Sequence, residues 1–215
     1  MNTVDETGWK VGGPLQWLHV AVSAQVSVYA ILPGRGYEQS RVLLGAVYDG
    51  FLVHDGWAPY YRFRLAFHQS CLNHLLTRCR EMAQILSPAA SALSQAVQHL
   101  LLASLVLRDR YAQGAVSEHG LRVATGRLEA ELDRRLESRC RNPANRRLRR
   151  HLEHERPWLF TFLYCPGLDV RRQSDLARRA DAAGAGECAA HLLAAGQGCV
   201  CAPGRVVAHP PGCDP

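Results

Sequence analysis

The sequence predicts an α/β fold: a mixed sheet with flanking helices, then an all-α insertion, then a disordered C-terminal tail. Short runs of β-branched and aromatic residues lie between glycine and proline breaks in the first third of the 215 residues. Apolar residues then recur at helical spacing. Residues 170–215 are dominated by Ala, Arg, Gly, Pro and Cys and lack aromatic residues. Such a composition buries too little apolar surface to offset the entropy of ordering.

Four strands and a short helix are expected before residue 58. The expected strands are residues 3–7, 15–23, 26–32 and 51–54, and the second and third form a hairpin. Pro33-Gly34-Arg35-Gly36 ends the hairpin, and the helix over 37–45 should turn Val42, Leu43 and Leu44 inward. Three strands, a helix and a fourth strand are the opening order of a ribonuclease H-like domain, although order alone is a moderate signal.

Helices dominate the middle of the chain. Pro59 can begin a short helix to residue 64, an extended stretch covers 65–70, and a helix over 71–86 stops at Ser87-Pro88. Asn142-Pro143 is a capping residue followed by proline at the first helical position, which opens a later helix. Two amphipathic stripes lie between, formed by Leu93, Ala96, Val97, Leu100, Leu101 and Leu105, and by Leu121, Ala124, Leu128, Leu132 and Leu136. We expect these helices to form one packed insertion.

Charge and composition limit the partners and the compartment. The net charge of +6 favours a polyanion, although codon usage in a GC-rich genome would also explain why Lys10 is the one lysine. No apolar run approaches the ~20 residues that span a bilayer, and no secretory signal is evident. We therefore expect a cytoplasmic protein with no membrane partner and with its eight cysteines reduced.

Two aspartates are candidates for metal chemistry. Asp5 lies on the first strand and Asp55 ends the fourth, and these strands are neighbours in a ribonuclease H-like sheet. Carboxylates that meet at one rim suit Mg²⁺, which assists phosphoryl transfer. Aspartate is also a common turn residue, so the spacing leaves a purely structural role open. Strand alternation turns Glu6 to the opposite face, where a solvated or hydrogen-bonded role is expected.

Four separated stretches carry a family resemblance. They are VDETGW at 4–9, YAILPGRG at 29–36, VHDGWAPY at 53–60 and HQSCLNHL at 68–75. In this order, between about Thr3 and Asp169, they resemble the catalytic domain of bacterial transposases of the insertion-sequence 66 family. The resemblance implies a ribonuclease H-like fold with a helical insertion, and a D-D-E triad that binds Mg²⁺ or Mn²⁺ for DNA cleavage and strand transfer. It makes Asp5 and Asp55 the first two triad members.

The cysteine and histidine cluster has two interpretations. His68, Cys71, His74 and Cys79 lie within twelve residues, which would suit zinc. A run along the start of one helix cannot easily surround a tetrahedral ion. The resemblance instead implies that His68, Cys71 and His74 support the active site or position DNA, and a buried structural pair of Cys71 and His74 is the alternative.

Arginines are the candidate DNA contacts. Arg78, Arg80, Arg146 and Arg150 could follow a DNA backbone, and Arg146 and Arg150 share a helical face by their i, i+4 spacing. A solvated helix face explains the same run equally simply. Trp9, Trp17 and Trp57 are expected in packing roles.

The third carboxylate is missing from its expected place. The resemblance puts it shortly after residues 160–167, within an Asn-Asn-x-Ala-Glu-Arg type motif, but residues 168–178 read LDVRRQSDLAR. Glu187 lacks the flanking pattern, and Glu153 and Glu155 precede Pro157 and are expected to be exposed. We hypothesise a frame shift near Asp169, which would make the tail out of frame and largely disordered, with a helix near 174–183.

The expected domain boundaries follow from this resemblance. Residues 1–86 would be a partial catalytic core, 87–169 a helical insertion leading toward the missing Glu helix, and 170–215 the tail. We expect a transposase fragment, truncated at both ends and inactive because the triad acts as a unit. The alternative is a non-catalytic remnant that binds double-stranded transposon ends, itself or an intact transposase. The four motifs disfavour a nuclease acting on RNA or junctions.

Overall fold

The chain divides into two compact units. The computed structural model describes residues 1–10, 13–165, 168, 170, 199–202 and 205–208. The first unit comprises Met1–His68 and Val170–Pro215, and the second comprises Gln69–Asp169. The division of these compact units falls at residue 68, and the helix that follows packs against the next helix of the second unit.

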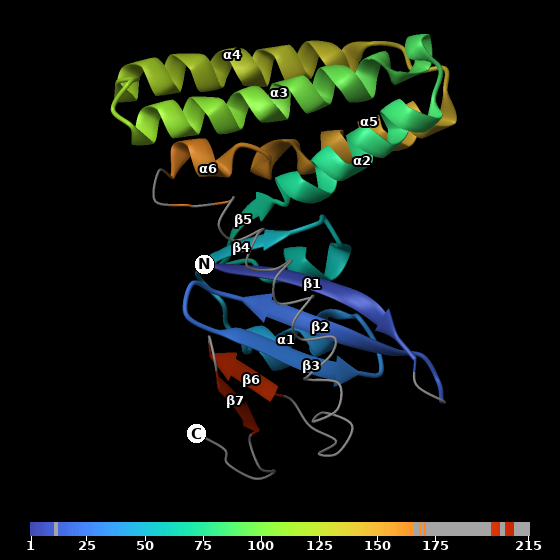
Figure 1. Cartoon of the computed structure of the whole chain (residues 1–215), viewed down its shortest axis with the longest axis vertical. Coiled ribbons are helices and arrows are strands. Elements are labelled where there is room, and N and C mark those ends of the chain that lie inside the picture. The colour runs from blue at the N-terminus through green and yellow to red at the C-terminus, as the bar shows by residue number, and fades with distance from the viewer. Residues whose placement is uncertain (11–12, 166–167, 169, 171–198, 203–204, 209–215) are drawn as a thin grey trace. The chain divides into compact units, whose positions relative to one another are not determined.

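One mixed sheet contains all the described strands (Figure 1). Its order is β5-β4-β1-β2-β3-β6-β7. β1, β2 and β3 are antiparallel neighbours, and β4 joins the other side of β1 in parallel. The strands are β1 (Asn2–Trp9), β2 (Gln16–Val22), β3 (Ser27–Leu32), β4 (Phe51–His54), β5 (Phe67–Ser70), β6 (Cys199–Ala202) and β7 (Arg205–Ala208). The expected hairpin of the second and third strands is confirmed.

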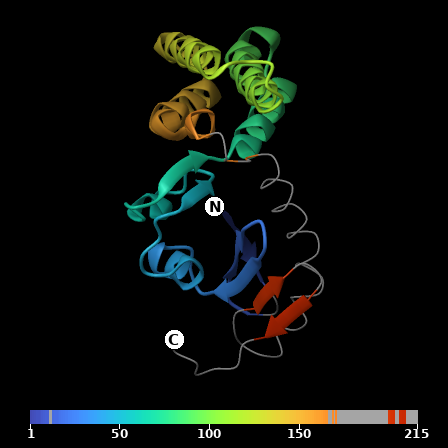
Figure 2. The ribbon, with the colours of Figure 1, turned by 90° about the vertical axis from the view of Figure 1, so that its left-hand side faces the viewer.

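Two helices cover one face of the first unit's sheet. Figure 2 shows α1 (Tyr37–Leu44) to one side of β1, β2 and β3. α1 ends at Gly45, whose φ of 84° favours glycine. A 3₁₀ helix, η1 (Ala58–Arg62), packs against α1. Between them lies an apolar core made of Val4, Ala21, Leu44, Leu52, Tyr60 and Phe63.

The expected inward turn of α1 is partly wrong. Leu44 is buried and Leu43 packs at the edge of the core, but Val42 is 65% exposed. Three consecutive positions span most of a helical turn, so they cannot all face one side.

Helices make up the second unit. They are α2 (Leu72–Ile85), α3 (Pro88–Ala112), α4 (Glu118–Glu137), α5 (Pro143–Glu155), the 3₁₀ helix η2 (Arg156–Trp158) and α6 (Thr161–Tyr164). α3 packs against α2, α4 and α5, and Figure 1 shows α3 and α4 side by side. The expected start of α5 is confirmed, because the Asn142 carboxamide oxygen accepts a hydrogen bond from the Ala144 N–H at 2.8 Å.

The two predicted apolar stripes form much of this unit's core. Val97, Leu101 and Leu105 of α3 are buried, as are Leu121 and Leu132 of α4. The helices of residues 87–169 therefore pack together as the spacing predicts.

α3 is a long helix rich in apolar residues. Among the described residues it is the one helix that could cross a membrane by length and composition, with 25 residues and a mean hydropathy of 1.4 over its best window. The expectation that no apolar run approaches this length was therefore too strict. Its buried residues pack within the second unit, as those of a core helix do, so its composition is weak support for a membrane span.

Part of the tail forms strands. β6 pairs with β3 and with β7, both antiparallel. These eight residues differ from the expected disorder, and the β-branched Val200, Val206 and Val207 favour strand formation there. The expected helix near 174–183 and Glu187 lie outside the described residues.

Candidate active site

Asp5 lies on β1, and Asp55 directly follows β4, the parallel neighbour of β1. β1 pairs with β4 so that Asn2 lies opposite Leu52 and Thr3 lies opposite Val53. Asp5 is two residues beyond Thr3, and Asp55 is two residues beyond Val53. Asp5 is half-buried and Asp55 is exposed. The two sequence-predicted carboxylates therefore lie on, and just after, two neighbouring strands.

Local backbone groups orient both carboxylates. The Glu6 N–H donates to Asp5 Oδ1 at 2.9 Å, and the Trp57 N–H donates to Asp55 Oδ1 at 2.9 Å. The second contact closes a turn in which a side-chain oxygen replaces a backbone carbonyl. Gly56, between Asp55 and Trp57, has a φ of 92°, in the region that favours glycine. The Asp-Gly-Trp sequence is therefore the local reason for the orientation of Asp55.

A buried histidine pair supports the Asp55 turn. The Gly56 N–H donates to His54 Nδ1 at 3.1 Å, which makes that nitrogen an acceptor. The proton of a neutral His54 ring is then on Nε2, from which it donates to His68 Nδ1 at 2.9 Å. The exposed fractions of His54 and His68 are 1% and 8%. The predicted support residue His68 is therefore linked to the turn through His54, by two hydrogen bonds in series.

Glu6 shares the electrostatic environment of the two aspartates. Its carboxylate accepts a hydrogen bond of 2.5 Å from the Tyr60 hydroxyl, within the buried side of the sheet. Burial raises the pKa of Glu6 to about 7, assisted by the charges of Asp55 and Asp5 and opposed by the Tyr60 hydrogen bond and the charge of Arg35. Burial first, and then the Glu6 charge, raise the pKa of Tyr60, so its hydroxyl stays protonated. Glu6 is thus a hydrogen-bonded neighbour.

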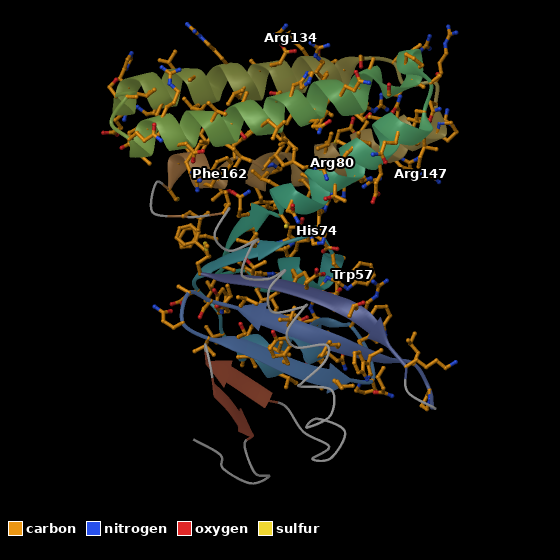
Figure 3. All side chains as sticks on the ribbon, viewed as in Figure 1. Trp57, His74, Arg80, Arg134, Arg147 and Phe162 are labelled. Atoms are coloured by element: carbon orange, nitrogen blue, oxygen red, sulfur yellow. The ribbon has the colours of Figure 1, made fainter. Side chains whose placement is uncertain are left out.

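Cys71 and His74 do not form a buried pair. Cys71 precedes α2 and is 5% exposed, whereas His74 lies on the exposed side of α2 (Figure 3). The i, i+3 spacing of Cys71 and His74 does not place them on one helix face, because Cys71 precedes the first residue of α2. Burial raises the pKa of the Cys79 thiol to about 11. Within the described ranges, no three His, Cys, Asp or Glu side chains are grouped to hold a metal ion.

Glu155 is buried, contrary to expectation. Its exposed fraction is 1%, and the Ser70 hydroxyl donates to Glu155 Oε2 at 2.7 Å. His154 Nδ1 lies 3.1 Å from the other oxygen, Oε1. A proline two residues later predicts only where the helix ends, and not which side its last turn buries. Glu153, in contrast, faces solvent beside Arg149, as expected.

The predicted DNA-contacting arginines lie on two helices of the second unit. On α2, Arg78 is half-buried and Arg80 is exposed (Figure 3). On α5, Arg146 and Arg150 are both exposed and share one face. Arg149 is instead within 3.3 Å of the Glu153 carboxylate. The exposed guanidinium groups are therefore separable from one that is already paired.

Sequence reasoning missed three residues near the aspartates. His54, Tyr60 and Arg35 lie in the quoted motifs, but periodicity assigns the first two to a strand and a short helix, and the third to a loop. One usable signal was His54, because a histidine immediately before a candidate metal ligand often orients it. Nothing in the spacing relates Arg35 to Asp55.

Comparison with known proteins gives one match. The family model described as Transposase IS66 family matches residues 1–171. No curated protein matches the chain. No solved structure matches it either.

Proposed function

Because the chain belongs to the IS66 transposase family, we propose that its first unit is a ribonuclease H-like catalytic core for DNA transposition. Membership carries a general role in transposition, with DNA as the partner and a divalent metal as the usual cofactor. The strand order supports the finer assignment: β1, β2 and β3 are antiparallel, and β4 is parallel to β1. The observation that carries the proposal is the parallel pairing of β1, which contains Asp5, with β4, which Asp55 directly follows.

Asp5 and Asp55 are the residues that would hold Mg²⁺ or Mn²⁺. Their chemistry fits, since hard divalent cations prefer carboxylate oxygens. A bound ion would activate the attacking oxygen and stabilise the leaving oxygen during phosphoryl transfer. The backbone N–H groups of Glu6 and Trp57 keep the carboxylates oriented before any ligand arrives. The pair His54 and His68 fixes the turn on which Asp55 lies, which gives His68 the supporting role expected of it.

The proposal includes that this chain does not cleave DNA. Among the described residues of the first unit, the acid beside the pair is Glu6, and its carboxylate already accepts a hydrogen bond from the Tyr60 hydroxyl. Residues 168–178 lack the Ala-Glu-Arg sequence. A triad without one of its members has little activity, because its members act together.

A strand-cleavage assay tests the inactivity. Supercoiled plasmid is incubated with the purified chain in Mg²⁺ or Mn²⁺, with Asp55→Asn as the matched control. No cleavage beyond the control is expected. Robust cleavage by the unaltered chain that disappears in Asp55→Asn would show an active enzyme and overturn this part of the proposal.

The frame-shift hypothesis is tested on the gene. If a shift near codon 169 created the tail, one alternative frame encodes an Asn-x-Ala-Glu-Arg motif downstream. Absence of that motif from both alternative frames would show the hypothesis to be wrong.

A second candidate function is DNA binding without catalysis. The exposed Arg146 and Arg150 favour it, since cations on one helix face can follow a phosphate backbone. Such a remnant would bind transposon ends or an intact transposase. Binding to a DNA duplex that weakens steeply with salt supports this function, and absent or salt-independent binding removes it.

A further inference from the structure

Arg35 is held between two tryptophans. Its guanidinium carbon lies 3.9 Å from the ring centroid of Trp57 and 4.5 Å from that of Trp17. The Trp57 indole N–H also donates to the Arg35 carbonyl oxygen at 2.9 Å. Two cation–π contacts restrict the rotamers of a normally mobile side chain.

The loop that carries Arg35 is fixed on both sides. The His19 ring nitrogen Nε2 lies 2.8 Å from the Gly34 carbonyl oxygen, and the side chain of Gln39 accepts the Gly36 N–H at 3.0 Å. Both anchors belong to regular elements, β2 and α1. The position of the guanidinium is therefore determined by the fold rather than by a ligand.

The charge of Arg35 is available for a ligand. Within the described part of the chain its guanidinium makes no hydrogen bond and no ion pair, although it is half-buried. Arg41, in the same unit, lies 2.8 Å from the Glu38 carboxylate instead. A guanidinium has five N–H donors, and none of those of Arg35 has an acceptor among the described residues. A fixed set of donors of this kind suits a planar or tetrahedral oxyanion.

Arg35 is connected to Asp55 through Trp57. The ring of Trp57 contacts the guanidinium, and its backbone N–H donates to Asp55 Oδ1 at 2.9 Å. A DNA strand that approaches two carboxylates is repelled by them, and a nearby cation offsets that repulsion.

We propose that Arg35 is a DNA phosphate-binding residue, which holds a phosphodiester of the strand that enters the Asp5 and Asp55 site. Trp17 and Trp57 preorganise its guanidinium for a bidentate contact with two phosphate oxygens. This inference rests on the proposed function, because it takes the ligand to be DNA. The competing role for Arg35 is a structural clamp that joins Trp17 to Trp57 and touches no ligand.

Salt-dependent binding distinguishes the two roles. Binding of a short fluorescein-labelled DNA duplex is measured by anisotropy over a range of salt, for the full chain and for Arg35→Gln. The slope of log K against log salt is negative, and removing one arginine that binds a phosphate reduces its magnitude by about 0.9. Arg62→Gln is the matched control. Arg62 belongs to the same unit and also contacts an aromatic ring, with its guanidinium carbon 4.0 Å from the ring centroid of Tyr37, and this proposal assigns it no phosphate.

The outcomes separate this inference from the function beneath it. A slope reduced in Arg35→Gln and unchanged in Arg62→Gln supports phosphate binding. Equal slopes in Arg35→Gln and the unaltered chain assign Arg35 to the clamp and overturn the inference alone. If the unaltered chain binds no DNA, the inference and the proposed function fail together.

A chemical variant of the DNA keeps the test valid if Arg35→Gln is unstable. Neutral methylphosphonates replace single phosphates along the duplex, and Arg35→Lys retains the charge but has no planar fork. One methylphosphonate position should weaken binding to the unaltered chain and have a smaller effect on Arg35→Lys. Equal effects of every position on both proteins would contradict a bidentate phosphate contact.

Discussion

At the scale of single residues, the environment of Glu6 is set by burial, one hydrogen bond and the charges of Asp55, Asp5 and Arg35. The Tyr60 hydroxyl is buried and has Glu6 as its partner at 2.5 Å. Replacing Tyr60 by Phe keeps the ring in the core and removes only this donor. The hydrogen bond from Tyr60 therefore explains how the half-buried Glu6 is accommodated near Asp5 and Asp55.

We predict that Tyr60→Phe lowers the free energy of unfolding by about 1 kcal/mol, the usual net value of such a hydrogen bond. Chemical denaturation by urea measures it. In the background of Glu6→Leu, which has no acceptor, the same tyrosine substitution should cost much less. Equal costs in both backgrounds would mean that the contact contributes nothing.

His19 predicts a dependence of stability on pH. Its ring is buried beneath the sheet, and this burial lowers its pKa below 6.5, although the hydrogen bond to the Gly34 carbonyl opposes the shift. The unfolded chain therefore binds a proton more readily than the folded chain, and stability is lost as pH falls below 6.5 through the folded pKa.

The measurement is the free energy of unfolding of the unaltered chain minus that of His19→Gln, which can still donate to Gly34. We expect this difference to decrease as pH falls below the ordinary histidine range. Taking the difference removes the contributions of Glu6 and other acids. A difference that stays constant with pH would contradict the lowered pKa.

At the scale of elements, the sequence predicted one helix cap, Asn142, which the structure confirms. Ser117 accepts the Gly120 N–H at 3.1 Å before α4, and Asn142 accepts the Ala144 N–H at 2.8 Å before α5. We predict that Asn142→Ala costs about 1 kcal/mol of stability. Thermal and urea denaturation of Asn142→Ala and Asn142→Asp check this, and Asp should keep most of the cap. A loss in Asn142→Asp as large as in Asn142→Ala would assign the effect to something other than capping.

The apolar spacing predicted the helices but not all that they bury. Ser94 and Ser104 of α3 are fully buried, because their hydroxyls donate to the carbonyls of Ser91 and Leu101 in the preceding turn. A pattern of apolar residues cannot include them. Glu155 was missed for a similar reason, since its partner Ser70 is eighty-five residues away in sequence.

The carboxylate pair was predictable and its surroundings were not. Asp5 and Asp55 could be placed together because strand order and motif agree on neighbouring strands. The stacking of Arg35 on Trp17 and Trp57 joins a loop, a strand and a turn, and periodicity within any one of them does not contain it. Contacts between elements are decided by packing, which a single sequence does not specify.

At the scale of the whole molecule, excess positive charge is the property that relates to DNA. The net charge of +6 is carried almost entirely by arginine. Surface cations that contact phosphates release counterions, whereas cations already in ion pairs release few. The arginines of α5 include both kinds, since Arg146 and Arg150 are exposed and Arg149 lies beside Glu153.

We predict that replacing Arg146 and Arg150 together by Gln lowers the salt slope of DNA binding by about 1.8, because each arginine that binds a phosphate accounts for about 0.9 of that slope. Arg149→Gln is the matched control and should leave the slope nearly unchanged. Fluorescence anisotropy with a labelled duplex measures all three proteins. The same slope in the double variant and the unaltered chain would assign these residues to a solvated helix face.

The proposed catalytic core depends most on a metal site formed by the carboxylates of Asp5 and Asp55. Electron paramagnetic resonance of Mn²⁺ measures this directly, because the signal of the free ion decreases as it binds protein. We predict weak binding to the unaltered chain, little or none to Asp5→Asn or Asp55→Asn, and unchanged binding to Asp49→Asn, which removes an exposed aspartate of the same unit. Equal binding by all four proteins would contradict the site.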